Sequence, residues 1–307
     1  MKRVLVTGAM GFIGSHCLSL LTAEGYEIHA ASTKMVRDPD TRGVVWHRCD
    51  LLDSSQVSDL LAIVKPTHLL HLAWYAVPTK YWTSAENLRW VQASLDLLHA
   101  FACHGGRRVV AAGSCAEYDW ASGHCSEATT PLRPATLYGA CKLSLQVVLE
   151  AYCRQFGLTF AWGRVFFLYG PRERPEKFVA SIISSLLQGM PARCSHGNQI
   201  RDFLYVRDVA HAFVTLLDCE VSGPMNIASS EPIALKTIAG RIAEKLGRMD
   251  LLELGAIAAS PGEPPVLTAD STRLKSETTW KKTHDLESGL DETIAWWKAN
   301  LAVHAVA

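Results

Sequence analysis

Tyr138 and Lys142 are four positions apart in the stretch Tyr138-Gly-Ala-Cys-Lys142. In a helix, side chains at this spacing lie one turn apart on the same face, with Cβ atoms about 5–6 Å apart. An ammonium beside a phenol favours the phenolate and lowers the tyrosine pKa from its ordinary value of about 10. The pair could therefore act as an acid or base near neutral pH, although the same spacing is also common on ordinary helix surfaces.

Three glycines form a second group with chemical meaning. Gly8, Gly11 and Gly14 follow a short apolar segment, residues 2–7, and precede a segment of helical spacing, residues 15–23. A further strand pattern comes next, so the order is that of a βαβ unit. Glycines let the backbone approach a pyrophosphate, and the helix N-terminus offers unpaired N–H groups to it. The pattern predicts dinucleotide binding.

Strand and helix patterns continue to alternate up to residue 168, which predicts a parallel sheet with helices on both faces. From Tyr169 onwards, loops containing proline separate shorter helices, and we expect few strands there. The predicted fold is α/β, a doubly wound parallel Rossmann sheet with a smaller, interleaved C-terminal α/β lobe. We predict a dinucleotide-binding domain at residues 1–168 and a substrate-binding lobe at residues 169–307. The expected strands are 26–31, 44–47, 68–72, 108–112 and 159–167, and the expected helices are 54–65, 85–104, 134–156, 178–188, 206–218, 235–246 and 286–300.

Composition excludes several classes of function. Thirty Lys and Arg residues balance thirty Asp and Glu residues, which removes the electrostatic argument for nucleic acid or an anionic membrane as a partner. No apolar run approaches the ~20 residues of a membrane helix, and glycines interrupt the apolar stretch at the N-terminus, so we expect a cytoplasmic protein. The nine cysteines and twelve histidines show no metal-ligand spacing, so we expect no metal site.

The combination Thr7-Gly-x-x-Gly-x-x-Gly14, Gly113-Ser114 and Tyr138-x-x-x-Lys142 resembles the extended short-chain dehydrogenase/reductase family, in particular its nucleotide-sugar (NAD-dependent epimerase/dehydratase) branch. Tyr169-Gly-Pro-Arg and Arg201-Asp-Phe match it as well. The resemblance implies that Tyr138 exchanges a proton with the sugar oxygen and that Ser114 hydrogen-bonds the same oxygen. It also implies that Lys142 lowers the tyrosine pKa and holds the nicotinamide ribose.

The end of the second strand bears on the choice of cofactor. An NAD enzyme needs a carboxylate there for the ribose 2′-hydroxyl, whereas this chain has Ser32, with Lys34 and Arg37 close behind. A hydroxyl and two cations suit a 2′-phosphate, so NADPH is expected and NAD is the alternative; the two cations could also belong to a solvated loop. Asp50 and Leu51 are expected near the adenine, or could simply begin a helix. The expected cofactor-binding residues are Gly8, Gly11, Phe12, Ile13, Gly14, Ser32, Lys34, Arg37, Asp50, Leu51, Leu72, Ala73, Tyr138 and Lys142.

Departures from the family pattern narrow the reaction. Cys115 and Ala116 stand where the resembling 4,6-dehydratases carry Asp-Glu, so a second acid and base are missing and dehydration is not expected. Ser32, and Phe167 in place of a substrate-binding Asn, favour a reductase. The sequence therefore predicts NADPH-dependent reduction of the 4-keto group of an NDP-4-keto-6-deoxy-sugar. An NAD-dependent nucleotide-sugar 4-epimerase is the alternative, and a non-catalytic dinucleotide sensor is a third possibility.

The expected partner is a nucleotide-diphosphate sugar. Arg201 matches the arginine that contacts the diphosphate in the family, or else pairs with Asp202; the segment 259–263 lacks the second arginine, which Arg193 or Arg273 could replace. The expected substrate-binding residues are Trp74, Phe167, Lys177 and Arg201. Helices 85–104 and 136–156 correspond to those that pair two subunits in the family, so a homodimer is expected.

Overall fold

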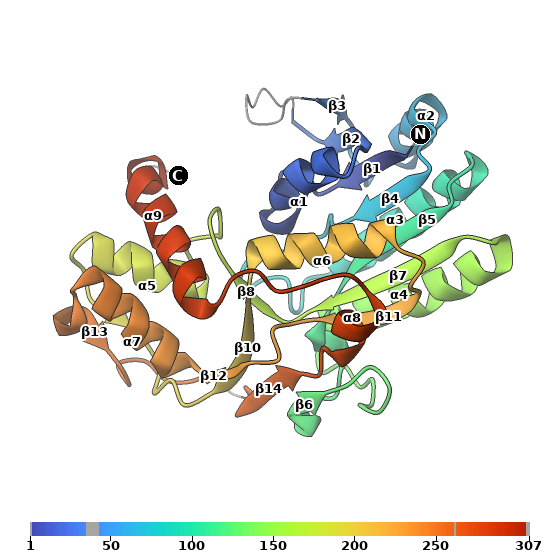
Figure 1. Ribbon diagram of the computed structural model, residues 1–307. Coiled ribbons are helices and arrows are strands. Elements are labelled where there is room, and N and C mark those ends of the chain that lie inside the picture. The colour runs from blue at the N-terminus through green and yellow to red at the C-terminus, as the bar shows by residue number, and fades with distance from the viewer. Residues whose placement is uncertain (1, 35–42, 261, 305–307) are drawn as a thin grey trace.

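A seven-stranded parallel sheet forms the centre of the computed structural model, which describes residues 2–34, 43–260 and 262–304 (Figure 1). Its strand order is β11-β7-β5-β4-β1-β2-β3. The order reverses beside β1, as in a doubly wound sheet, and confirms the predicted Rossmann architecture. The strands are β1 (Arg3–Thr7), β2 (Glu27–Ser32), β3 (Val44–Arg48), β4 (His68–His71), β5 (Arg108–Ser114), β7 (Thr159–Val165) and β11 (Gly223–Ile227).

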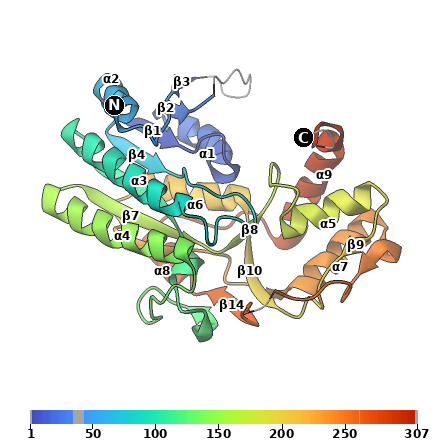
Figure 2. The same cartoon turned by 180° about the vertical axis from the view of Figure 1, so that it is seen from behind.

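Helices cover both faces of this sheet (Figures 1 and 2). On one face, α1 (Phe12–Ala23) and α6 (Val206–Asp218) share a buried apolar cluster with Val4 and Val6 of β1. Leu5, between these two valines, joins the opposite cluster. Successive strand side chains point to opposite faces, so the unbroken apolar run of β1 is what two covered faces require. The opposite face is covered by α2 (Ser54–Val64), α3 (Glu86–Cys103) and α4 (Leu137–Phe156).

The C-terminal lobe contains more strands than the sequence pattern predicted. Its sheet has the order β12-β10-β14-β6, and β8 pairs with β10. Because most of these strands have two to four residues, they are too short to show an alternating pattern. The strands are β6 (His124–Cys125), β8 (Phe167–Tyr169), β9 (Ala192–Arg193), β10 (Ile200–Tyr205), β12 (Pro232–Ala234), β13 (Leu252–Glu253) and β14 (Val266–Ala269), and the helices are α5 (Phe178–Leu187), α7 (Leu235–Leu246), α8 (Thr272–Glu277) and α9 (Leu286–His304).

The two units exchange segments. Helix α6 packs on α1, and strand β11 completes the large sheet, although both come after residue 168. In the other direction, β6 pairs with β14 in the small sheet. A division of function at residue 168 stays a prediction. Each of the two sheets contains strands from both sides of that residue.

Two local boundaries place the catalytic candidates. Helix α4 begins at Leu137 rather than at 134, because the Thr136 hydroxyl accepts a hydrogen bond from the Gly139 N–H and caps the helix. Tyr138 therefore lies in the first turn of α4, and Ser114 is the last residue of β5. Within the described residues, no helix is long and apolar enough to cross a membrane.

Candidate active site

Ser114 and Tyr138 meet at the carboxyl end of β5. The Ser114 hydroxyl lies near enough to the phenol of Tyr138 to lower its pKa, and its Oγ accepts a hydrogen bond from the Ala116 N–H at 3.2 Å. The carboxyl edge of a parallel sheet is where ligands bind in this architecture. The structure thus brings together two of the three side chains predicted to act on the substrate.

An aromatic enclosure surrounds the Tyr138 ring. The ring centroids of Tyr81, Trp82 and Trp74 lie 4.9, 5.7 and 6.4 Å from that of Tyr138, all in edge-on geometry. Burial raises the pKa of Tyr138, and the Ser114 hydroxyl acts in the opposite direction. The phenol is therefore held in its protonated form, contrary to the lowered pKa that the sequence pattern predicted. Tyr81 and Trp82 belong, with Trp74, to the aromatic cluster that follows the fourth strand, where the family resemblance places the start of the sugar pocket; of the three, only Trp74 is among the predicted substrate-binding residues.

Lys142 lies one helical turn beyond Tyr138 and is 4% exposed. Its ammonium donates a hydrogen bond to the Ala112 carbonyl at 2.8 Å and sits 3.7 Å from the centroid of the Trp74 ring. Burial lowers the pKa of Lys142 to about 7, and the Glu117 carboxylate opposes this effect. Even a small change in surroundings therefore changes the charge of this side chain near neutral pH.

Glu117 is a buried charged residue that the sequence pattern did not single out. It ends the short 3₁₀ turn Cys115–Glu117, and its carboxylate accepts hydrogen bonds from the Ser114 N–H at 2.7 Å and from Arg164 Nε at 2.7 Å. Arg164 lies inside an apolar strand, β7, and is 1% exposed. A charged residue within such a strand is the sequence signal that predicts a buried partner.

The glycine loop has the shape that a pyrophosphate cradle needs. Gly8 has a φ of +70°, and a Cβ there would lie 2.7 Å from the Ala73 nitrogen. A Cβ on Gly14 would lie 2.2 Å from the Gly8 carbonyl oxygen. Gly11 caps α1 without a side chain, so the N–H groups of the first turn, at Phe12 and Ile13, face a ligand position. These residues, with Leu72 and Ala73 against the loop, fit a dinucleotide.

The predicted adenosine end is less closed. Ser32 ends β2, and its Oγ accepts a hydrogen bond from the Lys34 N–H at 3.1 Å, while the Lys34 side chain is exposed. Asp50 is exposed and Leu51 is buried directly after β3. Asp53 caps α2, so the stretch from Asp50 also begins a helix. Arg37 lies outside the described residues.

The predicted phosphate arginine has an acidic partner. Arg201 is buried in β10, and its guanidinium donates to Glu263 at 2.7 Å. The Arg201 guanidinium carbon lies 5.4 Å from the centroid of Phe167, which places these two predicted substrate residues together. The Lys177 ammonium lies 5.3 Å from the Tyr81 ring, on the wall that also touches Tyr138.

The two alternative arginines are engaged elsewhere. Arg193 donates to the Ala256 carbonyl and pairs with Glu253. Arg273 donates to the carbonyl of Pro224 and pairs with Glu277.

The two positions after Ser114 hold no second acid and base. Cys115 and Ala116 are both buried in the 3₁₀ turn. Burial raises the pKa of the Cys115 thiol to about 12, so it stays protonated at neutral pH. Neither of these two side chains therefore supplies an acid or a base at neutral pH.

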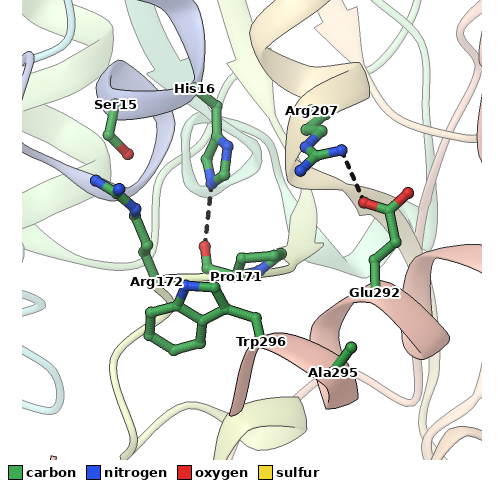
Figure 3. A pocket seen from close by; sticks show the side chains of 8 residues that line it. All are labelled: Ser15, His16, Pro171, Arg172, Arg207, Glu292, Ala295 and Trp296. Atoms are coloured by element: carbon green, nitrogen blue, oxygen red, sulfur yellow. Dashed lines mark hydrogen bonds and ion pairs between the residues drawn. The ribbon is translucent and has the colours of Figure 1, made fainter. Parts of the chain in front are cut away.

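A cavity of about 500 Å³ separates α1 from α9 (Figure 3). Ser15 and His16, which directly follow the glycine loop, form one wall, and His16 Nε2 contacts the Pro171 carbonyl oxygen at 3.0 Å. Beside them, Arg207 of α6 pairs across the cavity with Glu292 of α9 at 2.8 Å (Figure 3). The cavity therefore lies between α1, which begins directly after the glycine loop, and α9 of the C-terminal lobe.

Comparisons with known proteins agree with this geometry. Residues 4–228 match the model of the NAD dependent epimerase/dehydratase family. The chain is 26% identical over 332 residues to UDP-glucuronate 4-epimerase 1 of Arabidopsis thaliana, covering 96% of this chain and 76% of the relative. It is 25% identical over 311 residues to UDP-glucuronic acid decarboxylase 1 of Xenopus tropicalis, covering 98% and 73%.

A solved structure shares the whole architecture. The UDP-glucose 4-epimerase of Thermus thermophilus, in complex with NAD, superposes with a TM-score of 0.83 at 27% identity, over 97% of this chain and 99% of that chain. The predicted short-chain dehydrogenase/reductase architecture, nicotinamide cofactor class and enzymatic nature are thus confirmed. The chain belongs to the NAD dependent epimerase/dehydratase family of nucleotide-sugar enzymes.

Proposed function

We propose that this chain is a nucleotide-sugar 4-epimerase that acts on a UDP-hexose and retains its NAD. Relatives named as UDP-sugar 4-epimerases support this proposal over the predicted 4-ketoreductase. The observation that carries it is the placement of Ser114, at the end of β5, beside Tyr138, in the first turn of α4, with no second acid and base at Cys115 and Ala116. Epimerisation at a carbinol carbon needs one group that removes a proton and returns it, and the site offers one.

Tyr138, once ionised to the phenolate, would take the proton of the sugar 4-hydroxyl and later return it to the same oxygen. The Ser114 hydroxyl would hold that oxygen within reach of the phenol. Lys142, on the same face of α4, would supply the positive charge that favours the phenolate. A bound nicotinamide supplies the redox chemistry, because it can accept the hydrogen at C4 and give it back.

The diphosphate would enter between the large sheet and the lobe, where Arg201 lies beside Phe167. An arginine fork matches the geometry of phosphate oxygens. Glu263 occupies part of that fork, so a diphosphate must replace the carboxylate as partner.

The predicted NADPH-dependent 4-ketoreductase remains a second candidate because of one observation. Ser32, rather than a carboxylate, ends β2, and its Oγ faces the Lys34 N–H. A carboxylate at this position would repel a 2′-phosphate, and a hydroxyl does not.

Identification of the cofactor retained through purification separates the two candidates. The protein is denatured after gel filtration, and the released nucleotide is identified by mass spectrometry. A 4-epimerase retains NAD and converts a UDP-hexose to its 4-epimer with no added cofactor. Purification without cofactor, together with NADPH oxidation on addition of a 4-keto-6-deoxy sugar nucleotide, would replace the epimerase with the reductase.

A further inference from the structure

We infer that Glu117 is a positioning residue, which fixes the backbone of Ser114 and places a carboxylate in the buried site next to Lys142. This inference rests on the proposed function only for its catalytic consequence. The geometry itself belongs to the chain without any ligand. Glu117 is not among the residues predicted to contact the dinucleotide or the nucleotide sugar.

The first part is a contact with Ser114. One carboxylate oxygen of Glu117 accepts the Ser114 N–H at 2.7 Å and the Trp162 indole N–H at 3.0 Å. The Ser114 side chain in turn caps the same 3₁₀ turn, so the two residues satisfy each other's polar groups. Gly113 packs directly against this pair, since a Cβ there would lie 2.6 Å from Glu117 Oε1. The position of the Ser114 hydroxyl is thereby fixed.

The second part is electrostatic. Glu117, Arg164 and Lys142 are 0%, 1% and 4% exposed, so two cations and one anion share the interior behind the site. The Lys142 ammonium bonds to the Ala112 carbonyl, and the Glu117 carboxylate accepts the Ser114 N–H two residues farther along β5. The carboxylate counteracts the effect of burial on the Lys142 pKa. Across from Lys142, on β4, His71 bonds to Thr7 and stays neutral at working pH, because burial lowers its pKa to about 3.

Other groups satisfy Arg164 on its far side. Its guanidinium donates to the Tyr118 hydroxyl at 3.0 Å and to Gln146 at 3.4 Å.

Two aromatic rings face Lys142. The centroids of the Trp74 and Trp162 rings lie 3.7 and 5.8 Å from its ammonium. A ring face attracts the cation but carries no net charge. Glu117, which accepts the Trp162 indole N–H, is therefore the carboxylate that acts on Lys142 from the adjoining turn.

The test is a direct titration of Lys142. Lysine labelled with ¹³C at Cε is incorporated into the protein as purified, and the Lys142 signal is assigned by its loss in K142M. In E117Q, the midpoint of the Lys142 titration falls by about one pH unit or more, the effect expected on losing a nearby opposite charge. The pH optimum of turnover moves in the same direction.

Two further variants separate charge from structure. E117D keeps the charge but withdraws it from the Ser114 N–H, so the Lys142 midpoint stays near the wild-type value while kcat falls. In E117Q alone, Arg164 would be left buried without its ion-pair partner, which could destabilise the chain. The double variant E117Q/R164M removes both charges, and the midpoint of the Lys142 titration should still fall. E150Q is the matched control, because Glu150 bonds to Gln146 at the outer end of the same network.

A Lys142 midpoint equal to that of the wild type in both E117Q and E117Q/R164M overturns the inference. The proposed function fails separately: if no nucleotide sugar is turned over by the wild type while the midpoint still falls in E117Q, the epimerase proposal is wrong and the role of Glu117 stands.

Discussion

At the scale of single residues, the site combines one phenol with a small set of groups that control it. Burial among Tyr81, Trp82 and Trp74 holds the Tyr138 phenol protonated, and the Ser114 hydroxyl favours its ionisation. Such opposed effects make a group that loses a proton only when a partner assists it. This suits a residue that must first be ionised, and then remove the sugar proton and return it.

Tyr138→Phe tests this assignment. The substitution removes the proton-transfer group and keeps the ring, so kcat should fall by roughly 10²–10⁴-fold. Retention of the cofactor through purification should not change, because the glycine loop is untouched. Tyr152→Phe is the matched control: Tyr152 lies on the same helix but bonds to His99 on the outer face. Turnover of Y138F within tenfold of Y152F would remove Tyr138 from the mechanism.

His71 gives the fold a dependence on pH. Burial lowers the pKa of His71 to about 3, below the unfolded value of about 6.5. Because the unfolded chain binds the proton more tightly, the stability present above pH 6.5 is lost as the pH falls towards 3. Between pH 6.5 and 5 the loss is about 2 kcal/mol, at about 1.36 kcal/mol per unit.

Urea unfolding of the wild type and H71Q at pH 7 and pH 5 measures this contribution. The wild type should lose about 2 kcal/mol more than H71Q on acidification. Equal losses in the two proteins would show that His71 does not titrate between the folded and unfolded states.

At the scale of elements, the turn between β1 and α1 is fixed by close backbone contacts. Gly14 touches the Gly8 carbonyl, and Gly8 touches the backbone of Leu72 and Ala73 after β4. The geometry of the loop is therefore set by contacts within the chain itself. It is the part of the site whose shape the residue types alone dictate.

Gly14→Ala tests that geometry. Its Cβ would lie 2.2 Å from a backbone oxygen that cannot move aside, so we expect a loss of about 1–3 kcal/mol of stability and of the retained cofactor. Gly240→Ala is the control: a Cβ there meets nothing within 4 Å inside α7, so stability should rise by about 0.5–1 kcal/mol. Thermal unfolding and nucleotide release measure both, and a fully loaded, stable G14A would contradict the cradle.

The parts that the sequence could predict share a local origin. The glycine loop, the long helix that carries Tyr138 and the parallel order of the large sheet depend on patterns within a few neighbouring residues. The ion pair of Glu117 with Arg164, and that of Arg201 with Glu263, join residues 47 and 62 positions apart. Such contacts follow from tertiary packing, which no local pattern encodes. The short strands of the lobe were missed because two to four residues show no period.

At the scale of the whole molecule, the two units exchange segments, and one covered face remains apolar on its outside. Helices α3 and α4 pack together on that face (Figure 2). Leu88, Val147 and Val148 on these helices are 58%, 54% and 47% exposed. We propose that this face pairs two subunits, as the family resemblance implies.

Substitution of Val147 and Val148 by glutamate tests the dimer. Two charges in an apolar interface should disrupt it, so sedimentation velocity should show a monomer for the double variant and a dimer for the wild type. Ile63→Glu is the control, because Ile63 is 76% exposed on α2, which covers the same side of the sheet but is not one of the two helices proposed to pair. A wild-type protein that sediments as a monomer would contradict the proposal.

The most direct test of the central claim follows the hydrogen at C4 of the sugar. UDP-glucose carrying deuterium at C4 is incubated with the protein as purified, with no cofactor added, and the product is analysed by NMR and mass spectrometry. A 4-epimerase returns the same hydrogen to the opposite face, so the account predicts a 4-epimer that retains its deuterium at C4. No epimer from deuterated UDP-glucose or from equally labelled UDP-glucuronate, with turnover only of 4-keto sugars and added NADPH, would contradict it.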